Sequence, residues 1–248
     1  RQLRNRLDEL ETGQVIVALG QQLMALRAEN EALLAAAHRV CSLNQALHAT
    51  RREGIFPLGA AVPHVSYLPV RALHQQIAKV TRFNSPQAFS YMFSPGYEPL
   101  RRQVAIRMRD AGVVVDPSEV VITHGCVEAI HMALRVLTQP GDLIATESPT
   151  YYGLLQVVES LQLKTLEIPC SPRSGMSIEA LELAFQTQPR LKAVVVVPDL
   201  QMPLGARMPD ENKARLVALC AAHGAALIED DSYGLFVEGL PVKPLKAW

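Results

Sequence analysis

Leu227-Ile228-Glu229-Asp230-Asp231-Ser232-Tyr233-Gly234 is the most informative stretch of this chain. It starts as an apolar run, like a buried strand, and continues into acidic residues, with a tyrosine three residues after Asp230. Open α/β sheets bind their ligands beyond the carboxyl ends of the parallel strands. At that place Asp230 can hold a cationic ring nitrogen while Tyr233 reaches a neighbouring oxygen. The stretch therefore predicts an α/β sheet with a ligand site at its carboxyl edge.

Helical and strand-like segments alternate from about residue 70 onward. The expected strands are short and almost wholly apolar, which is typical of parallel strands that are buried on both faces. We expect strands at 120–123, 143–146, 164–168, 193–197 and 226–229. We expect helices near 70–83, 97–111, 126–138, 152–161, 177–187 and 209–223. This order predicts an α/β fold whose mainly parallel sheet is covered by helices on both faces.

Residues 1–53 form a predicted helical segment of different composition. Its first 50 residues lack proline, and apolar residues recur every seven positions at Leu19, Leu26, Leu33, Val40 and Leu47. The companion positions are mostly Asn or Ala, so a dimerising coiled coil and an amphipathic helix lying on its own domain both stay open. A loop that contains Gly and Pro begins at Gly54, and we place the start of the main domain, residues 54–248, there.

The composition argues against several classes of protein. The chain has 248 residues and is 49% hydrophobic, which is enough for a sizeable core. Lys and Arg number 24, as do Asp and Glu, so no overall charge attracts the chain to nucleic acid or an anionic membrane. No apolar stretch reaches the roughly 18 residues of a membrane-spanning helix. The four cysteines lack the spacing of a zinc site or a secreted disulfide scaffold, so we expect a cytoplasmic protein without a metal.

Three further strand-to-loop segments could contribute to a ligand site. Gly125 lies in the turn after the strand at 120–123, where free N–H groups of a helix start can bind an anion, although such turns are also common without a ligand. Tyr151 follows the strand at 143–146 and can stack on a flat ring, or it can cap the core. The segment 197–205 is a strand followed by a turn with Pro and Gly, and alone it predicts an ordinary loop.

Taken together, five segments resemble class I and II aminotransferases. The segments are Ser94–Arg101, His124–Cys126, Glu147–Gly153, Gln201–Gly205 and Glu229–Gly234. The resemblance covers about residues 54–248 and is greatest to the aminotransferase-like half of MocR/GntR-type regulators and to 2-aminoadipate aminotransferases. It implies the large domain of the PLP-dependent transferase fold (fold type I), truncated before its carboxyl-terminal domain, behind a helical amino-terminal segment.

The resemblance implies pyridoxal 5'-phosphate as the cofactor and a role for each matching residue. Gly125 and Cys126 would present backbone N–H groups to the phosphate, and Tyr151 would stack on the pyridine ring. Asp230 would pair with the ring nitrogen and keep it protonated, which makes the ring an electron sink. Tyr233 would donate a hydrogen bond to the phenolic oxygen.

The chain departs from the family pattern at two places. Met202 stands where the family has an Asn whose amide binds the phenolic oxygen, and a thioether cannot donate that hydrogen bond. We therefore expect weakened or altered cofactor binding. The Schiff-base lysine of the family lies beyond Trp248 in the pattern, so no catalytic residue is assigned and the chain as given is not expected to transaminate. Glu229 and Asp231 match no family role and are expected to bind backbone or solvent.

Three functional hypotheses follow from the resemblance. The chain is part of an aminotransferase that moves an amino group from an amino acid to a 2-oxo acid, or it is the effector-sensing module of a MocR/GntR-type regulator, or it is a degenerate copy without activity. A homodimer is expected, with Tyr91 reaching the phosphate in the partner subunit. DNA would be bound only through a domain outside this chain, and no membrane partner is expected. The substrate is not encoded in the matched segments.

Overall fold

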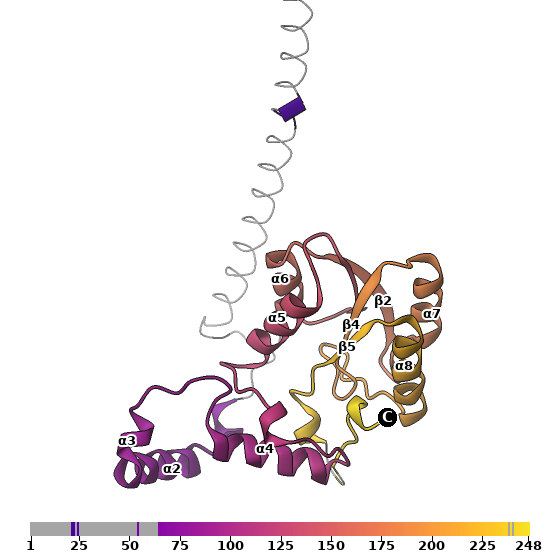
Figure 1. The fold of residues 1–248 in the computed structure, drawn as a ribbon. Coiled ribbons are helices and arrows are strands. Elements are labelled where there is room, and N and C mark those ends of the chain that lie inside the picture. Colours follow the sequence, from indigo (N-terminus) through magenta and orange to yellow (C-terminus); the bar gives the residue numbers. More distant parts are fainter. Residues whose placement is uncertain (1–20, 23, 25–53, 55–63, 238, 240) are drawn as a thin grey trace, which may run out of the picture. The chain divides into compact units, whose positions relative to one another are not determined.

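The computed structural model describes residues 21, 22, 24, 54, 64–237, 239 and 241–248. The chain divides into two compact units, Arg1–Phe89 and Ser90–Trp248 (Figure 1). The heptad seam predicted between residues 19 and 47 lies outside the described residues. The domain boundary predicted at Gly54 stays a prediction.

The described part of the first unit consists of short helical elements. The 3-10 turn η2 (Val65–Tyr67) is followed by α2 (Val70–Phe83) and α3 (Ser85–Ala88). The apolar residues of α2 recur at helical spacing, and they are Val70, Leu73, Ile77 and Val80. This spacing makes α2 amphipathic and explains why the helix predicted at 70–83 is confirmed.

The second unit is built around a five-stranded sheet. Its strands are β1 (Leu143–Ser148), β2 (Lys164–Ser171), β3 (Gly175–Met176), β4 (Leu191–Val196) and β5 (Ala226–Glu229). The order across the sheet is β3-β2-β1-β4-β5, and all pairs are parallel except β2 with β3. The mainly parallel sheet predicted from the sequence is therefore confirmed. The short antiparallel β3 was not predicted, because two residues are too few to show a period.

Helices connect the parallel strands, as a parallel sheet requires. The second unit has α4 (Glu98–Asp110), α5 (Cys126–Leu137), α6 (Tyr152–Ser160), α7 (Ile178–Thr187) and α8 (Asp210–His223). Its 3-10 turns are η3 (Pro117–Glu119), η4 (Gly234–Phe236) and η5 (Leu245–Ala247). Local signals set the helix ends: the Ser177 hydroxyl accepts from Ala180 N at 3.2 Å, and α8 stops at Gly224, whose φ of 61° favours glycine.

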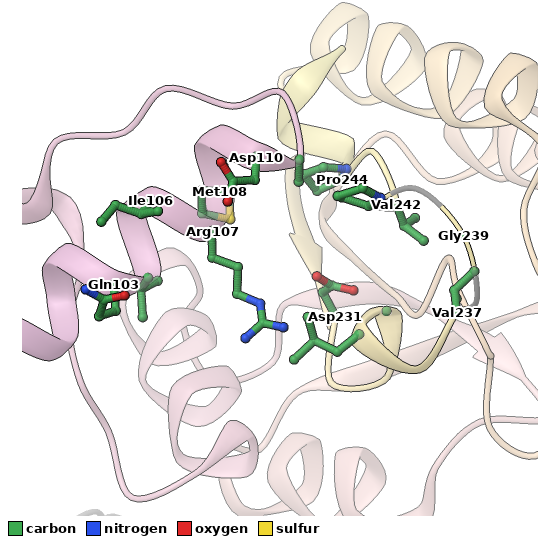
Figure 2. Close-up of a pocket in the computed structure, with 15 residues that line it drawn as sticks. Gln103, Ile106, Arg107, Met108, Asp110, Asp231, Val237, Gly239, Val242 and Pro244 are labelled. Carbon is green, nitrogen blue, oxygen red and sulfur yellow. The ribbon is translucent and has the colours of Figure 1, made fainter.

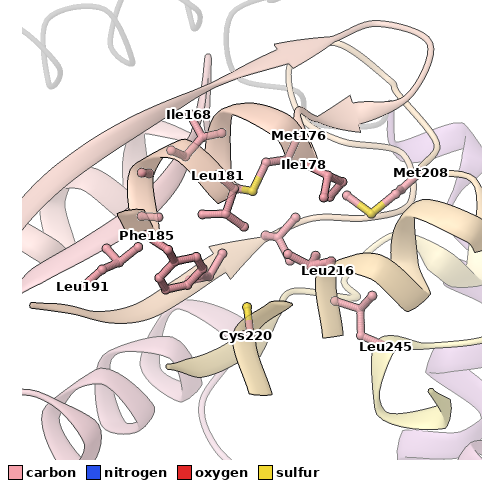
Figure 3. Packing of buried hydrophobic residues seen from close by; sticks show 14 residues of the cluster. Ile168, Met176, Ile178, Leu181, Phe185, Leu191, Met208, Leu216, Cys220 and Leu245 are labelled. Carbon is pink, nitrogen blue, oxygen red and sulfur yellow. The ribbon is translucent and has the colours of Figure 1, made fainter. Parts of the chain in front are cut away.

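Two apolar clusters cover the two faces of the sheet. Alternate residues of a strand point to opposite faces. Val194 and Val196 of β4 therefore join the cluster under α7 and α8, whereas Ala193 and Val195 join the cluster under α5 and α6. Figure 3 shows the first cluster, in which Leu181 and Phe185 of α7 and Leu216 of α8 lie over the sheet. Both faces are thus buried, which explains the continuous apolar sequence of β4.

The strand predicted at 120–123 does not form. Within the described residues this segment pairs with no strand, and Ile122 N donates to Pro95 O at 2.9 Å instead. Gly96, at a φ of 103°, lies so close to Ile122 that a Cβ added to the glycine would be 2.7 Å from the Ile122 Cβ. An apolar, extended sequence becomes a strand only beside a partner strand, and the only described pairing of β5 is with β4. The prediction was wrong because it was based on the apolar sequence of this segment alone and did not consider whether a partner strand lies beside it.

Candidate functional site

Asp230 lies at the carboxyl edge of the sheet, directly after β5. Its backbone N–H donates to Val196 O at 2.9 Å and so continues the pairing with β4. The Oδ1 atom accepts hydrogen bonds from Ser232 N at 3.0 Å and from Ser232 Oγ at 2.6 Å. It also accepts one from Cys126 Sγ at 3.1 Å. Among the described residues no donor reaches Oδ2, so one oxygen of this carboxylate is available to a ligand.

The contact with Cys126 brings the start of α5 next to Asp230. Burial chiefly raises the pKa of the Cys126 thiol to about 11, so the thiol stays protonated and can donate to the carboxylate. Gly125 precedes the helix with φ 119° and ψ 170°, a conformation that favours glycine. No side chain caps this helix, and a Cβ at Gly125 would meet no atom within 4 Å. The first turn of α5 thus presents backbone N–H groups that no side chain caps.

Tyr151 lies at the start of α6, after the carboxyl end of β1. Its ring centroid is 4.6 Å from that of Tyr152, with the two planes tilted by 49°. Burial is the main cause that raises the pKa of Tyr151, and Tyr152, Tyr233 and Asp230 add smaller effects of the same sign. These effects fall off with distance, so they indicate that Tyr151 shares its surroundings with Tyr233 and Asp230.

The structure brings together some of the predicted site residues and not others. Cys126 and Asp230 are in contact, and Tyr151 lies within the electrostatic range of Asp230 and Tyr233. Met202 is half-buried in the turn after β4, at the same edge of the sheet. Tyr91 is 91% exposed, and no described hydrogen bond or ring contact joins it to the other residues. The cofactor roles of all of them stay predictions.

Sequence reasoning missed the pair of Glu147 and Gln201. Both side chains are 1% exposed, and Glu147 Oε2 accepts from Val197 N at 3.1 Å and lies 3.5 Å from Gln201 Nε2. Burial raises the pKa of Glu147 to about 7, although Val197 and Gln201 lower it and Asp230 raises it further. The sequence feature that could have revealed this pair is Thr146–Glu147, two polar residues at the end of an apolar strand.

A second buried polar group lies on the α8 side of β5. Lys213 Nζ donates to Asp199 Oδ2 at 2.6 Å and to Lys243 O at 3.2 Å, and both charged side chains are 1% exposed. Glu229 Oε2 accepts from Leu245 N at 2.9 Å, and the pKa of Glu229 is raised to about 7, chiefly by burial. The backbone contact expected for Glu229 is confirmed. The sequence feature that could have revealed this group is the helical spacing of α8, which puts Lys213 on the same face as the buried Leu216 and Cys220.

Alternation along the chain explains why adjacent acids face different partners. Asp230 bonds to Cys126 at the start of α5, whereas Glu229 and Asp231 both interact with Lys213 of α8. Residues one apart at a strand end point to opposite sides of the sheet. Only Asp230 therefore belongs to the candidate site.

Asp231 also lines a pocket of about 680 Å³, which is distinct from the surroundings of Asp230. Its walls are residues of α4, the following Ala111, and residues of the segment from Asp231 to Pro244 (Figure 2). The Arg107 side chain extends from α4 into the space that Asp231 borders. No residue of the sequence-predicted site lines this pocket.

The residues around Asp230 fit a phosphate-bearing aromatic ring. The uncapped first turn of α5 offers N–H groups and open space beside Gly125 for an anion. One carboxylate oxygen of Asp230 is available for a protonated ring nitrogen, and a tyrosine ring lies in the same surroundings. The donor set thus matches the cofactor expected from the sequence.

Most of the chain matches a known family. Residues 61–247 match the family described as aminotransferase class I and II. This chain belongs to the aminotransferase class I and II family. The fold class and the resemblance inferred from the sequence are thereby confirmed.

Individual proteins of the family are similar over about half of their length or less. The chain is 37% identical over 188 residues to the uncharacterized HTH-type transcriptional regulator YjiR of Escherichia coli, covering 76% of this chain and 40% of that protein. It is 28% identical over 216 residues to aromatic-amino-acid aminotransferase 1 of Thermococcus litoralis, covering 85% and 52%.

The fold is also similar to a solved aminotransferase structure. The kynurenine aminotransferase of Pyrococcus horikoshii, crystallised with PMP, matches with a TM-score of 0.76 and 26% identity over 83% of this chain and 52% of that one. Its bound PMP agrees with the cofactor expected from the sequence. In the part of the chain that the structure describes, no helix is both long and apolar enough to cross a membrane.

Proposed function

We propose that this chain binds pyridoxal 5'-phosphate as the cofactor-binding part of an aminotransferase-type protein. The observation that carries the proposal is the contact of 3.1 Å between Cys126 Sγ and Asp230 Oδ1. In this contact the uncapped start of α5 and a carboxylate at the end of β5 lie next to each other, and such groups can bind a phosphate and a pyridinium nitrogen.

Each residue has a physical role in this proposal. The N–H groups of Gly125 and Cys126 bind the phosphate, and Asp230 Oδ2 accepts from the protonated ring nitrogen. Tyr151 holds the ring by stacking, and the Tyr233 hydroxyl donates to the phenolic oxygen. When bound, the cofactor supplies an electron sink for the charge left when an amino acid loses its α-proton.

The activity of the whole protein is also a proposal. We propose amino-group transfer from an amino acid to a 2-oxo acid, in a cytoplasmic homodimer in which Tyr91 binds the phosphate of the partner subunit. No lysine here is assigned to a covalent bond with the cofactor: Lys213 is held in its ion pair with Asp199, and Lys243 Nζ lies 3.2 Å from the centre of the Trp248 ring. Sedimentation of the purified protein tests the dimer.

A second candidate function, effector sensing, is supported by the sequence identity to a transcriptional regulator. The 37% identity to the regulator of Escherichia coli exceeds the 28% identity to the aminotransferase of Thermococcus litoralis. The same cofactor site would then sense an amino-acid effector instead of turning it over. Two assays separate the two functions: amino-group transfer and effector-dependent DNA binding, both measured with the protein purified from its native source.

Binding of pyridoxamine 5'-phosphate to the 248-residue chain tests the proposed site. This probe has no aldehyde and so does not react with surface lysines. We expect saturable binding that Asp230→Ala weakens by at least about tenfold, since a hydrogen bond to a charged group is lost. The control, Glu182→Gln, removes an exposed carboxylate on α7 and should leave the affinity unchanged. Equal affinities of wild type and Asp230→Ala would contradict the proposal, and so would the absence of saturable binding.

A further inference from the structure

Glu147 and Gln201 form a polar link across the carboxyl edge of the sheet. Glu147 lies near the end of β1, and Gln201 lies in the turn after β4. The Glu147 Oε2 atom accepts from Val197 N at 3.1 Å and lies 3.5 Å from Gln201 Nε2. Both side chains are 1% exposed, so solvent does not replace these contacts if they are broken.

Gln201 in turn joins two segments of the candidate site. Its Nε2 donates to Pro149 O at 2.8 Å, two residues before Tyr151. Its Oε1 accepts from Leu204 N at 3.0 Å, and this closes the turn that contains Met202. The orientation of one side-chain amide therefore sets the positions of both segments, and the Glu147 carboxyl is the neighbour that favours this orientation.

The cost of burying Glu147 indicates that its contribution is positional. Its Oε1 atom has no hydrogen-bond partner among the described residues and is fully buried. A buried oxygen without a partner lowers the stability of a fold. An apolar residue would avoid that cost, but Val197 N would lose this acceptor, and Gln201 Nε2 would keep only Pro149 O among its described acceptors.

We infer that Glu147 is a positioning residue of the proposed cofactor site, which holds the Gln201 amide and, through it, the segments of Tyr151 and Met202. The inference rests on the proposed function for its consequence, cofactor affinity. The hydrogen bonds themselves are a property of the ligand-free chain. Two measurements therefore separate the two claims.

The first measurement is amide hydrogen exchange of the ligand-free chain. We expect Glu147→Leu to speed the exchange of peptides covering 149–153 and 201–206 by about tenfold, because both lose their common anchor. Glu147→Gln keeps an acceptor oxygen and is expected to restore wild-type exchange in both. Peptides of β2 are the internal control and should not change. Wild-type exchange in Glu147→Leu, or equal effects of Leu and Gln, would overturn the inference.

The second measurement is the affinity for pyridoxamine 5'-phosphate and the absorption maximum of the bound probe. Glu147→Leu is expected to weaken binding by about tenfold and to shift the maximum, whereas Glu147→Gln stays within about threefold of wild type. An unchanged affinity in Glu147→Leu would refute the inference. Failure of the wild type to bind, together with the expected exchange pattern, would instead refute only the proposed function.

A variant at the other end of the link covers the case in which Glu147→Leu does not fold. Gln201→Leu removes the same connection from the turn side and is expected to give the same exchange pattern in 149–153 and 201–206. In the double variant Glu147→Gln/Gln201→Leu, the rescue by Gln at 147 should disappear. If Gln201→Leu speeds exchange only in 201–206, the claim that the Glu147–Gln201 link holds both segments is contradicted.

Discussion

Gly153 lies directly against the ring of Tyr151. A Cβ at this position would be 2.6 Å from the Tyr151 Cζ and 2.8 Å from its hydroxyl oxygen. Alanine suits a helix better than glycine by about 0.5 to 1 kcal/mol, so Gly153→Ala should not unfold α6. We expect it to displace the Tyr151 ring and to weaken binding of pyridoxamine 5'-phosphate by about tenfold, since stacking is lost. In a Tyr151→Ala background the same substitution should have no further effect on affinity.

Met202 stands where the resemblance to the family predicts an asparagine. A thioether donates no hydrogen bond, and a hydrogen bond to a charged oxygen contributes roughly 1.5 to 3 kcal/mol. We expect Met202→Asn to tighten cofactor binding by about tenfold or more and to change the absorption spectrum of the bound cofactor. Met202→Leu is the matched control and should behave as wild type. If Asn at this position changes neither affinity nor spectrum, Met202 does not limit cofactor binding.

At the scale of elements, Glu229 connects the end of β5 to the start of η5 through Leu245 N. Its pKa is raised from 4.5 to about 7, chiefly by burial, so the folded state holds a proton that the unfolded state releases. A raised carboxyl pKa contributes stability that is complete below pH 4.5 and is lost as the pH rises through 7. Each pKa unit corresponds to about 1.4 kcal/mol, so the full contribution is on the order of 3 to 4 kcal/mol.

We therefore expect the free energy of unfolding to fall between pH 5 and pH 7.5, and Glu229→Gln to reduce this fall by about 2 kcal/mol because Gln has no proton to lose. Urea unfolding of both proteins at the two pH values measures the difference. Glu182→Gln, on the exposed face of α7, should keep the wild-type slope. Parallel pH profiles of wild type and Glu229→Gln would show that Glu229 is ionised in the folded chain.

At the scale of the second unit, Lys213 ties three segments of the chain together. From α8 it contacts Asp199 in the turn after β4 and the Lys243 carbonyl near η5. Removing one partner of a buried ion pair leaves the other charge without compensation, at a cost of roughly 3 to 5 kcal/mol. Asp199 keeps Arg207 at 3.3 Å, so Lys213→Met should cost about 2 to 4 kcal/mol.

Urea unfolding measures this cost, and a second substitution tests its cause. We expect Lys213→Met/Asp199→Leu to be more stable than Lys213→Met alone, because the uncompensated charge is gone. Additive losses in the double variant would mean that packing of the lysine stem, and not its charge, stabilises this region.

The sequence alone determined the sheet class, most helices and strands, and the family. These follow from apolar periodicity and from ordered segments such as 229–234, which are local properties of the chain. It also singled out Asp230, which stands at a recognisable strand end, and Cys126, through the resemblance to the family. Their mutual hydrogen bond could not be predicted, since 104 residues separate them along the chain.

Only the tertiary structure decided which segments pair and which polar groups are buried. The segment 120–123 has the composition of a strand but lacks a described partner, and backbone pairing depends on neighbours that composition does not specify. Glu147, Gln201 and Lys213 are polar residues that a sequence assigns to the surface, and their burial follows from packing against distant segments. Packing and hydrogen bonding between remote residues depend on the three-dimensional arrangement, which local periodicity does not encode.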